Sequence, residues 1–294
     1  MTAQDGGGPT VTEFAPAKIN LYLEILGKRP DGYHLISSLI VFAGIGDEVA
    51  LAPGKGLSLE IDGPYAPVLA DDTRSNLMMR AAQRLANEVA VPADVAMRLT
   101  KRLPVASGIG GGSADAAATL RALVRLWRKD PGGAALARLG LALGADLPVC
   151  LDGRPSLVSG IGEIVEPAPP LPRAWLALVN PRVAVATREV FAARTGDFSP
   201  PLPWTETPSD AARLAARLAD RRNDLAAPAI GIAPVIGEAL AALESRPGCL
   251  LARMSGSGAT CFGLFASAEA ASAAATSIGA ARPDWWSVPA PILP

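Results

Sequence analysis

A run of four glycines within six residues constrains this chain more than any other feature. The run occupies residues 108–113, Gly-Ile-Gly-Gly-Gly-Ser, and it follows a strand-like alternation at residues 95–99 and precedes a helical pattern at 114–127. Glycine lets backbone N–H groups approach an anion closely, and a helix behind the run would add the positive end of its dipole. The run therefore predicts an anion-binding turn, with a flexible turn or a helix-packing segment as the alternative.

Two familiar nucleotide-binding motifs do not account for the run. The Walker A motif needs Lys followed by Ser or Thr after its last glycine, whereas Ser113 and Ala114 follow here. The Rossmann fingerprint needs a third glycine where Ser113 stands, and Pro104 interrupts the approach to the loop. It also needs an acid at the end of the next strand, but Asp130 falls in a turn after a helix. Any phosphate site here must use another architecture.

Composition narrows the class of protein. The 294 residues are 50% hydrophobic and 19% charged, which is typical of a globular chain, and the formal net charge of -1 argues against a nucleic-acid partner. The three cysteines, Cys150, Cys249 and Cys261, are scattered without a CxxC pair, which favours a reducing compartment. Residues 1–9 do not read as a signal peptide, and no apolar run reaches the roughly 18 residues of a membrane helix, so we expect a cytoplasmic protein.

The pattern of elements predicts an α+β fold, because strands and helices mix in both halves without regular alternation. The expected strands are at 19–26, 35–42, 48–51, 57–61, 95–99, 175–179, near 250 and at 260–265. The expected helices are at 75–90 (capped near Thr73 or Ser75), 114–127, 131–143, 187–194, 210–219, 235–245 and in the alanine-rich segment that follows the last strand. The proline-rich stretch 166–170 is the best linker candidate, and we expect an N-terminal domain at 1–160 and a C-terminal domain at 161–294.

A second glycine loop lies at residues 254–259, Met-Ser-Gly-Ser-Gly-Ala, between two apolar runs. Taken alone it indicates an ordinary hairpin or a β-bulge. Its meaning changes if it faces the first loop, because two glycine loops on one ligand would form a binding site.

Two charged residues interrupt apolar segments. Lys18 lies on the polar face of the expected strand at 19–26, and Asp146 lies in Leu-Gly-Ala-Asp-Leu-Pro at 143–148. An acid in apolar surroundings is costly unless paired, and a Lys–Asp pair would suit a kinase, with the acid accepting a hydroxyl proton. The alternative for Lys18 is a side chain that reaches solvent along its apolar stem.

The only histidine, His34, ends the turn Asp-Gly-Tyr-His at 31–34. A lone histidine cannot build a histidine-based metal cluster, and we expect no metal-ligating set of side chains. A surface or core hydrogen bond is one role for His34. A ligand contact is the other, since its turn follows closely on the Lys18 strand.

Three segments together resemble the GHMP kinase superfamily, which includes galactokinase and the homoserine, mevalonate and phosphomevalonate kinases. Residues 104–117 resemble its phosphate loop and following helix, 14–20 its N-terminal motif, and 253–259 its C-terminal glycine motif. They occur in the family's order and span nearly the whole chain. The resemblance implies a two-domain α+β fold with substrate and ATP in the cleft between the domains.

Further segments are similar to one branch of that superfamily, in the non-mevalonate route to isoprenoid precursors. They are 28–34 (Lys-Arg-Pro-Asp-Gly-Tyr-His), 101–104 (Lys-Arg-Leu-Pro) and 143–148. This resemblance implies ATP- and Mg²⁺-dependent phosphorylation of the 2-hydroxyl of a cytidine diphosphate-linked methylerythritol, by a monomer or homodimer. Another GHMP kinase, acting on a mevalonate-type or sugar substrate, is the alternative within the superfamily. A non-catalytic metabolite sensor on the same fold is the alternative outside catalysis.

The resemblance also assigns residues. Lys18 and Asp146 match the catalytic pair, and Ser113 is the one candidate for Mg²⁺, since Ala114-Asp115 replaces a Ser-Asn or Ser-Asp pair. The ATP contacts implied are Lys101, Pro104, Val105, Ala106, Ser107, Gly108, Ile109, Gly110, Gly111, Gly112, Ser113 and Ala114. The substrate contacts implied are Asn20, Tyr33, His34, Thr187, Phe191, Gly256, Ser257 and Gly258. For Phe191, packing in the core of its helix is the alternative to stacking on a base.

Overall fold

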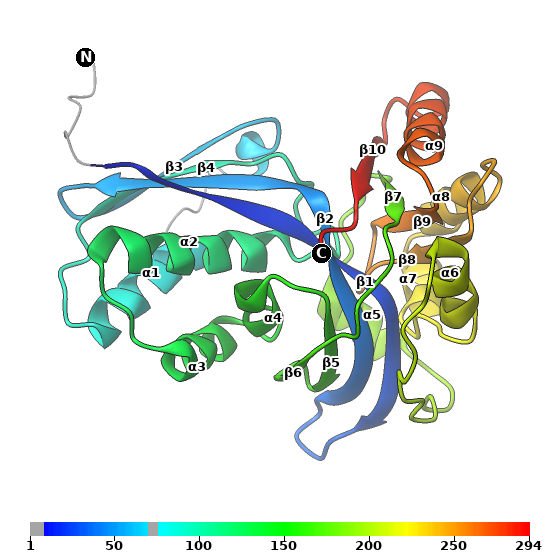
Figure 1. Ribbon diagram of the computed structural model, residues 1–294, viewed down its shortest axis with the longest axis horizontal. Helices are drawn as coiled ribbons and strands as arrows, with labels where there is room; N and C mark the ends of the chain where they lie inside the picture. Colours follow the sequence, from blue (N-terminus) through cyan, green and yellow to red (C-terminus); the bar gives the residue numbers. More distant parts are fainter. Residues whose placement is uncertain (1–8, 70–75) are drawn as a thin grey trace. The chain divides into compact units, whose positions relative to one another are not determined.

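The computed structural model describes residues 9–69 and 76–294, which form two compact units built from interleaved segments (Figure 1). The first unit comprises the chain up to Ala17 with Gly46–Val105 and Gly111–Asp152, and the second comprises Lys18–Ile45, Ala106–Gly110 and Gly153–Pro294. A sequence division at 160/161 instead treats the domains as consecutive blocks. The segments interleave because β1 (Val11–Lys28) and β2 (His34–Pro53) are long enough to contribute to both units. The predicted position of the active site between domains stays a prediction.

The sheet of the first unit is short. The end of β2 pairs antiparallel with β4 (Val95–Thr100), and β4 pairs parallel with β3 (Leu57–Asp62). The expected strands at 35–42 and 48–51 are therefore parts of one strand, β2. A 3₁₀ turn, η1 (Ala66–Val68), follows β3.

The helices of the first unit are α1 (Leu77–Glu88), α2 (Gly111–Trp127), α3 (Gly133–Leu143) and α4 (Leu147–Asp152). The N-cap of α1 is Asn76, whose side chain accepts from the N–H of Met78, and the caps expected at Thr73 or Ser75 lie outside the described residues. The start of α2 differs from the prediction. It begins at Gly111 and not at residue 114, so the last part of the glycine run forms the first turn of the helix.

The second unit contains a four-stranded antiparallel sheet in the order β10-β7-β9-β8. Its strands are β7 (Trp175–Asn180), β8 (Leu251–Met254), β9 (Cys261–Phe265) and β10 (Trp286–Pro291). The edge strand β10 carries Pro289 and Pro291, which an edge tolerates because one side of it makes no ladder bonds. In the same unit, the start of β2 pairs with β5 (Ser156–Gly160), and β5 pairs with β6 (Ile164–Pro167). Part of the expected linker 166–170 therefore belongs to a strand.

Five helices belong to the second unit's described residues: α5 (Thr187–Ala193), α6 (Ala211–Ala219), α7 (Ala226–Ile232), α8 (Val235–Glu244) and α9 (Ala268–Ala281). Helices α8 and α9 pack on the sheet, and their buried residues join one apolar core with β7 and β9. The mixture of helices and strands in both units confirms the predicted α+β class. Among the helices described, none is both long and apolar enough to span a bilayer.

Candidate active site

The two glycine loops contact each other within the second unit. The N–H of Thr260 donates to the carbonyl oxygen of Ser107 at 3.1 Å, and the hydroxyl of Ser255 donates to that of Gly108 at 3.1 Å. Gly108 has a φ of 72°, and a Cβ there would lie 2.5 Å from the carbonyl oxygen of Gly258. The second loop joins the antiparallel strands β8 and β9, as the hairpin prediction expects, and it also packs against the first loop. That the two loops share one binding site stays a prediction.

Positive φ angles recur along the first loop. Gly110 has a φ of 64°, and Ala106 has a φ of 52° although it carries a side chain. A residue with a Cβ costs about 1 kcal/mol or more in this region. Ala106 therefore adopts its left-handed conformation at an energetic cost.

The side chain of Asn223 binds the backbone of the second loop, and no sequence pattern predicts this role. Its side-chain amide donates to the carbonyl oxygens of Met254 and Gly256, both at 2.8 Å, and its Oδ1 accepts the N–H of Leu225 at 2.9 Å. Gly256 has a φ of 56° and lies against Gly108, whose carbonyl oxygen would be 2.7 Å from a Cβ. Asn223 therefore fixes the backbone of the loop at its point of contact.

Strand β1 runs beside both loops in the second unit. The backbone N–H of Lys18 donates to the carbonyl oxygen of Ile109 at 2.9 Å, and a Cβ on Gly110 would lie 3.1 Å from the Cβ of Lys18. Two residues along, the N–H of Asn20 donates to Oγ of Ser255 at 3.0 Å. The predicted catalytic lysine and the predicted substrate asparagine thus lie at the junction of the two loops.

The side chain of Asn20 has one polar atom left for a ligand. Its Nδ2 donates to Oγ of Ser38 at 2.8 Å, and that hydroxyl donates to the carbonyl oxygen of Tyr22 at 2.6 Å. Its Oδ1 is buried and has no hydrogen-bond partner among the described residues. Buried acceptors in native proteins are nearly always satisfied, so this oxygen is suited to a donor on a bound ligand. Ser38, which sets the amide's orientation, was not predicted from the sequence.

The predicted cytidine contacts also come together in the second unit. The ring centroids of His34 and Phe191 are 5.1 Å apart with an interplanar angle of 32°. Burial, together with the charges of Lys28 and Arg194, lowers the pKa of His34 below its ordinary value. Phe191 is partly buried and packs against the core, which supports its predicted packing role, while its stacking on a base stays a prediction.

Tyr33 and Thr187 complete the predicted substrate set. Tyr33 is 60% exposed beside His34, and its N–H donates to Oδ1 of Asp31 at 3.2 Å. The hydroxyl of Thr187, the first residue of α5, lies 2.9 Å from that of Ser257 in the second loop. The substrate residues predicted around His34 and those around the second loop are therefore linked through α5.

The first unit holds a buried cluster of charges. Lys101 Nζ lies 2.6 Å from Oδ2 of Asp47 and 2.8 Å from Oδ2 of Asp115, and all three side chains are almost fully buried. Burial raises the pKa of Asp115 to about 7, against the lowering effect of Lys101, with Asp47 raising it further. For Lys101, burial acts to lower the pKa, but the charges of Asp115 and Asp47 raise it. Lys101 was predicted as an ATP contact, while Asp47 was not predicted at all.

The remaining predicted residues divide between the units. Pro104 and Val105, and then Gly111, Gly112, Ser113 and Ala114 in the first turns of α2, belong to the first unit. Asp146 also belongs to the first unit, where its carbonyl oxygen accepts the N–H of Cys150 in α4 at 3.3 Å. Lys18 belongs to the second unit, so the Lys18–Asp146 pair stays a prediction.

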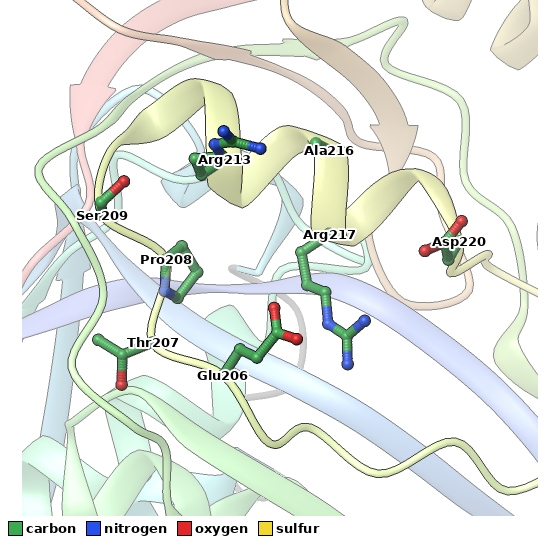
Figure 2. A pocket seen from close by; sticks show the side chains of 8 residues that line it. All are labelled: Glu206, Thr207, Pro208, Ser209, Arg213, Ala216, Arg217 and Asp220. Atoms are coloured by element: carbon green, nitrogen blue, oxygen red, sulfur yellow. The ribbon is translucent and has the colours of Figure 1, made fainter.

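A surface hollow of about 420 Å³ lies elsewhere in the second unit (Figure 2). Figure 2 shows Arg213, Ala216, Arg217 and Asp220 along α6 and its end, with Glu206 to Ser209 on the segment before it. Its lining includes none of the predicted site residues. Arginines and carboxylates are mixed around it, so its charge selects no particular ligand.

Known families match both parts of the chain. The family of GHMP kinases N terminal domains matches residues 76–154, and the GHMP kinases C terminal family matches 206–283. A 4-diphosphocytidyl-2-C-methyl-D-erythritol kinase of Paramagnetospirillum magneticum is 57% identical over 279 residues, covering 95% of this chain and 97% of the relative. This chain belongs to the GHMP kinases, in the family of that relative. A second member, from Rhodospirillum rubrum, is 52% identical and covers 97% of this chain and 94% of the relative.

Solved structures of GHMP kinases agree with this assignment. The crystal structure of a 4-(cytidine 5'-diphospho)-2C-methyl-D-erythritol kinase matches with a TM-score of 0.78 and 32% identity, covering 96% of this chain and 98% of that one. The homoserine kinase of Cytophaga hutchinsonii shares the fold. Its structure matches with a TM-score of 0.67 and 20% identity, covering 100% of this chain and 96% of that one. The chain is therefore an ATP-dependent GHMP kinase, and the resemblance drawn from its three motifs is confirmed.

Proposed function

We propose that this kinase transfers the γ-phosphoryl group of ATP to the 2-hydroxyl of 4-diphosphocytidyl-2-C-methyl-D-erythritol, in non-mevalonate isoprenoid precursor synthesis. The observation that carries the proposal is the junction of the two glycine loops beside Lys18 and Asn20. It brings backbone suited to phosphate next to a side chain with a free acceptor. The names of the full-length relatives at 57% and 52% identity support the same acceptor.

The proposed chemistry is direct in-line transfer without a phosphoenzyme. Asp146 accepts or orients the proton of the acceptor hydroxyl, and the ammonium of Lys18 orients both the acid and the hydroxyl. The backbone N–H groups of the first loop and the start of α2 offset the charge of the phosphates. The reaction then depends mainly on positioning and on preorganised charge, as is general for phosphoryl transfer.

The cytidine end of the acceptor is assigned to the second unit. His34 and Phe191 offer an imidazole and an aromatic face 5.1 Å apart, and the exposed Tyr33 precedes His34 in sequence. Stacking with hydrogen bonds to the base edge is a physically reasonable way to select cytosine. The free Oδ1 of Asn20 would accept a hydrogen bond from a hydroxyl of the polyol.

The side chains available as metal ligands fit a Mg²⁺ ion that is bound mainly by the nucleotide. Among residues 9–69 and 76–294 no three or more His, Cys, Asp or Glu side chains gather as a metal cluster. Mg²⁺ commonly keeps several waters and binds through substrate phosphates with few protein ligands, and it would neutralise charge on the β- and γ-oxygens. The hydroxyl of Ser113, in the first turn of α2, is the protein ligand that we propose.

The remaining expectations are part of the proposal. The three cysteines are free, in keeping with a reducing cytoplasm. We propose a monomer or homodimer that acts on a small molecule and does not bind nucleic acid, as the net charge of -1 suggests.

Acceptor selectivity tests the proposed function. ADP release should be measured with the diphosphocytidyl acceptor, with mevalonate and with homoserine at equal concentrations. We expect turnover with the first and at most a trace with the others. Faster turnover with mevalonate or homoserine would overturn the acceptor assignment, and ligand binding by calorimetry without ADP release would indicate a sensor.

A further inference from the structure

One buried carboxylate holds the segment that leads into the phosphate loop. Oδ1 of Asp47 accepts the backbone N–H groups of Arg102 and Leu103, at 2.6 and 2.8 Å. Its Oδ2 accepts from Lys101 Nζ at 2.6 Å. Three successive residues are therefore fixed by one side chain, which has no exposed surface, and Pro104 and the loop follow at once.

The same cluster reaches the helix after the loop. Lys101 Nζ also donates to Oδ2 of Asp115, which lies in α2 at 3% exposure. A Cβ on Gly111, the first residue of α2, would lie 3.1 Å from Nζ and 3.8 Å from Oδ2 of Asp47. The charges thus lie directly against the first turn of the helix. All of these residues belong to the first unit.

We propose that Asp47 is a positioning residue for ATP, acting as a clamp that joins both ends of the phosphate loop. The proposal rests on the proposed function, because it assumes that the loop binds ATP. Asp47 holds the chain before the loop by backbone hydrogen bonds, and through Lys101 it holds the helix after the loop. The distance between the two ends of the loop is thereby fixed before ATP binds, so the loop loses less conformational freedom on binding.

The charges of the cluster favour a role in positioning the loop over a role in folding stability alone. Two carboxylates share one ammonium, and Oδ1 of Asp115 is buried without a hydrogen-bond partner among the described residues. A single Lys–Asp pair would leave no excess buried charge, and even a paired buried charge seldom adds stability. Each carboxylate is instead needed to reach a different end of the loop. Lys101, whose ammonium is already held at 2.6 and 2.8 Å, is on this view also a positioning residue.

Four variants separate the parts of the clamp. Asp47→Ala removes the two hydrogen bonds to the N–H groups of Arg102 and Leu103 and the ion pair with Lys101, whereas Asp47→Asn keeps an acceptor for the two N–H groups and loses the charge facing Lys101. Asp115→Asn weakens only the tie to α2. Asp62→Asn is the matched control, since Asp62 pairs with Arg98 in an exposed ion pair in the same unit. Each is assayed for ATP Kd by calorimetry without acceptor, for KM of both substrates, and for its thermal unfolding midpoint.

We expect Asp47→Ala to raise the ATP Kd by about tenfold or more, with Asp47→Asn and Asp115→Asn intermediate. The acceptor KM should stay within about twofold in all variants, and the ATP Kd of Asp62→Asn should match the wild type. A fall in unfolding midpoint with an unchanged ATP Kd would show a merely structural role and overturn the proposal. If Asp47→Ala does not fold, unchanged ATP Kd values in both Asn variants overturn it as well.

Failure of the proposed function would give a different experimental result from failure of the clamp. A wild-type protein that binds ATP but does not phosphorylate the diphosphocytidyl acceptor loses its acceptor assignment. The ATP Kd series without acceptor still tests the clamp in that case.

Discussion

The hydroxyl of Ser255 donates a hydrogen bond to the carbonyl oxygen of Gly108 at 3.1 Å. Oγ of Ser255 in turn accepts the backbone N–H of Asn20 at 3.0 Å, so the Ser255 side chain joins both glycine loops to strand β1. These residues are up to 235 positions apart in sequence, and their contacts bring the two glycine motifs side by side, as a shared site would require. The predictions below test the parts of that site and the groups around it.

Gly108→Ala should damage the site more than an equivalent change elsewhere. A Cβ at Gly108 would lie 2.5 Å from the carbonyl oxygen of Gly258, in addition to the strain of a φ of 72°. Gly132→Ala is the matched control, because Gly132 has a φ of 84° and nothing within 4 Å of an added Cβ. We expect the control to lose about 1 kcal/mol of unfolding free energy. Gly108→Ala should lose more unfolding free energy than the control and should weaken ATP binding at least about tenfold. Equal losses of unfolding free energy and equal ATP Kd values in the two variants would contradict the packed loop junction.

Asp146→Asn and Lys18→Met should each reduce kcat by about two to four orders of magnitude, because each removes a group that handles the acceptor proton. ATP Kd should change little, since neither side chain is assigned to the nucleotide. Lys55→Met, which changes an exposed lysine of the first unit, is the control and should keep wild-type kcat. Near wild-type turnover in Asp146→Asn would remove that residue from the mechanism.

Phe191→Ala should raise the KM of the diphosphocytidyl acceptor by about 10- to 100-fold, the range expected for loss of one stacked base. The KM for ATP should be unaffected, because Phe191 pairs with His34 and is assigned to the cytidine end of the acceptor, not to the nucleotide. Phe198→Ala is a suitable control, since that ring is 46% exposed. A drop in unfolding midpoint with no change in acceptor KM would assign Phe191 to the core alone.

The acceptor KM should depend on pH through His34, the only histidine of the chain. Burial lowers the pKa of His34 below 6.5, so the imidazole is neutral at pH 7 to 8 and the KM should be flat there. The KM should change as the pH falls below 6.5 and the ring gains a proton. Because the unfolded chain binds that proton first, folding stability contributed by His34 is present above pH 6.5 and is lost on acidification. His34→Asn should lack both the change in acceptor KM and the loss of stability at low pH. The variant is compared with the wild type at each pH, so that the titration of ATP affects both alike. A variant with the wild-type pH profile would exclude His34 as the cause.

Ser38→Ala should impair acceptor binding without touching the acceptor's proposed contacts. It removes the acceptor that orients the Asn20 amide and a donor to the carbonyl oxygen of Tyr22, both in buried surroundings, at a cost of about 1–3 kcal/mol in unfolding free energy. We expect the acceptor KM to rise several-fold while the ATP Kd is retained. Ser37→Ala is the neighbouring control, because the Ser37 hydroxyl makes only a 3.5 Å contact with Tyr22. Equal KM values in the two variants would contradict the orienting role.

Much of the fold was predictable because its signals are local. The alternation in β3 and β4, the continuous apolar run of β7 and the apolar stripes of α1 and α6 involve residues only a few positions apart. Short elements such as α4, α7, β5 and β10 were missed, since few residues carry each pattern. The site was predictable where glycines or charges interrupt an apolar run, as at Lys18. Asp47, Asn223 and Ser38 were missed because each acts on partners far away in sequence.

By itself, the sequence determined the α+β class, the place of the two glycine runs, the motif order and the kinase family, because glycine runs and motif spacing depend only on chain chemistry. The tertiary structure alone decided that the second glycine loop packs on the first and that α2 begins at Gly111. It also decided that Asp47 takes three donors at once. Hydrogen bonds between distant segments depend on register and close packing, and a single polar residue carries no periodic signal of its eventual partner.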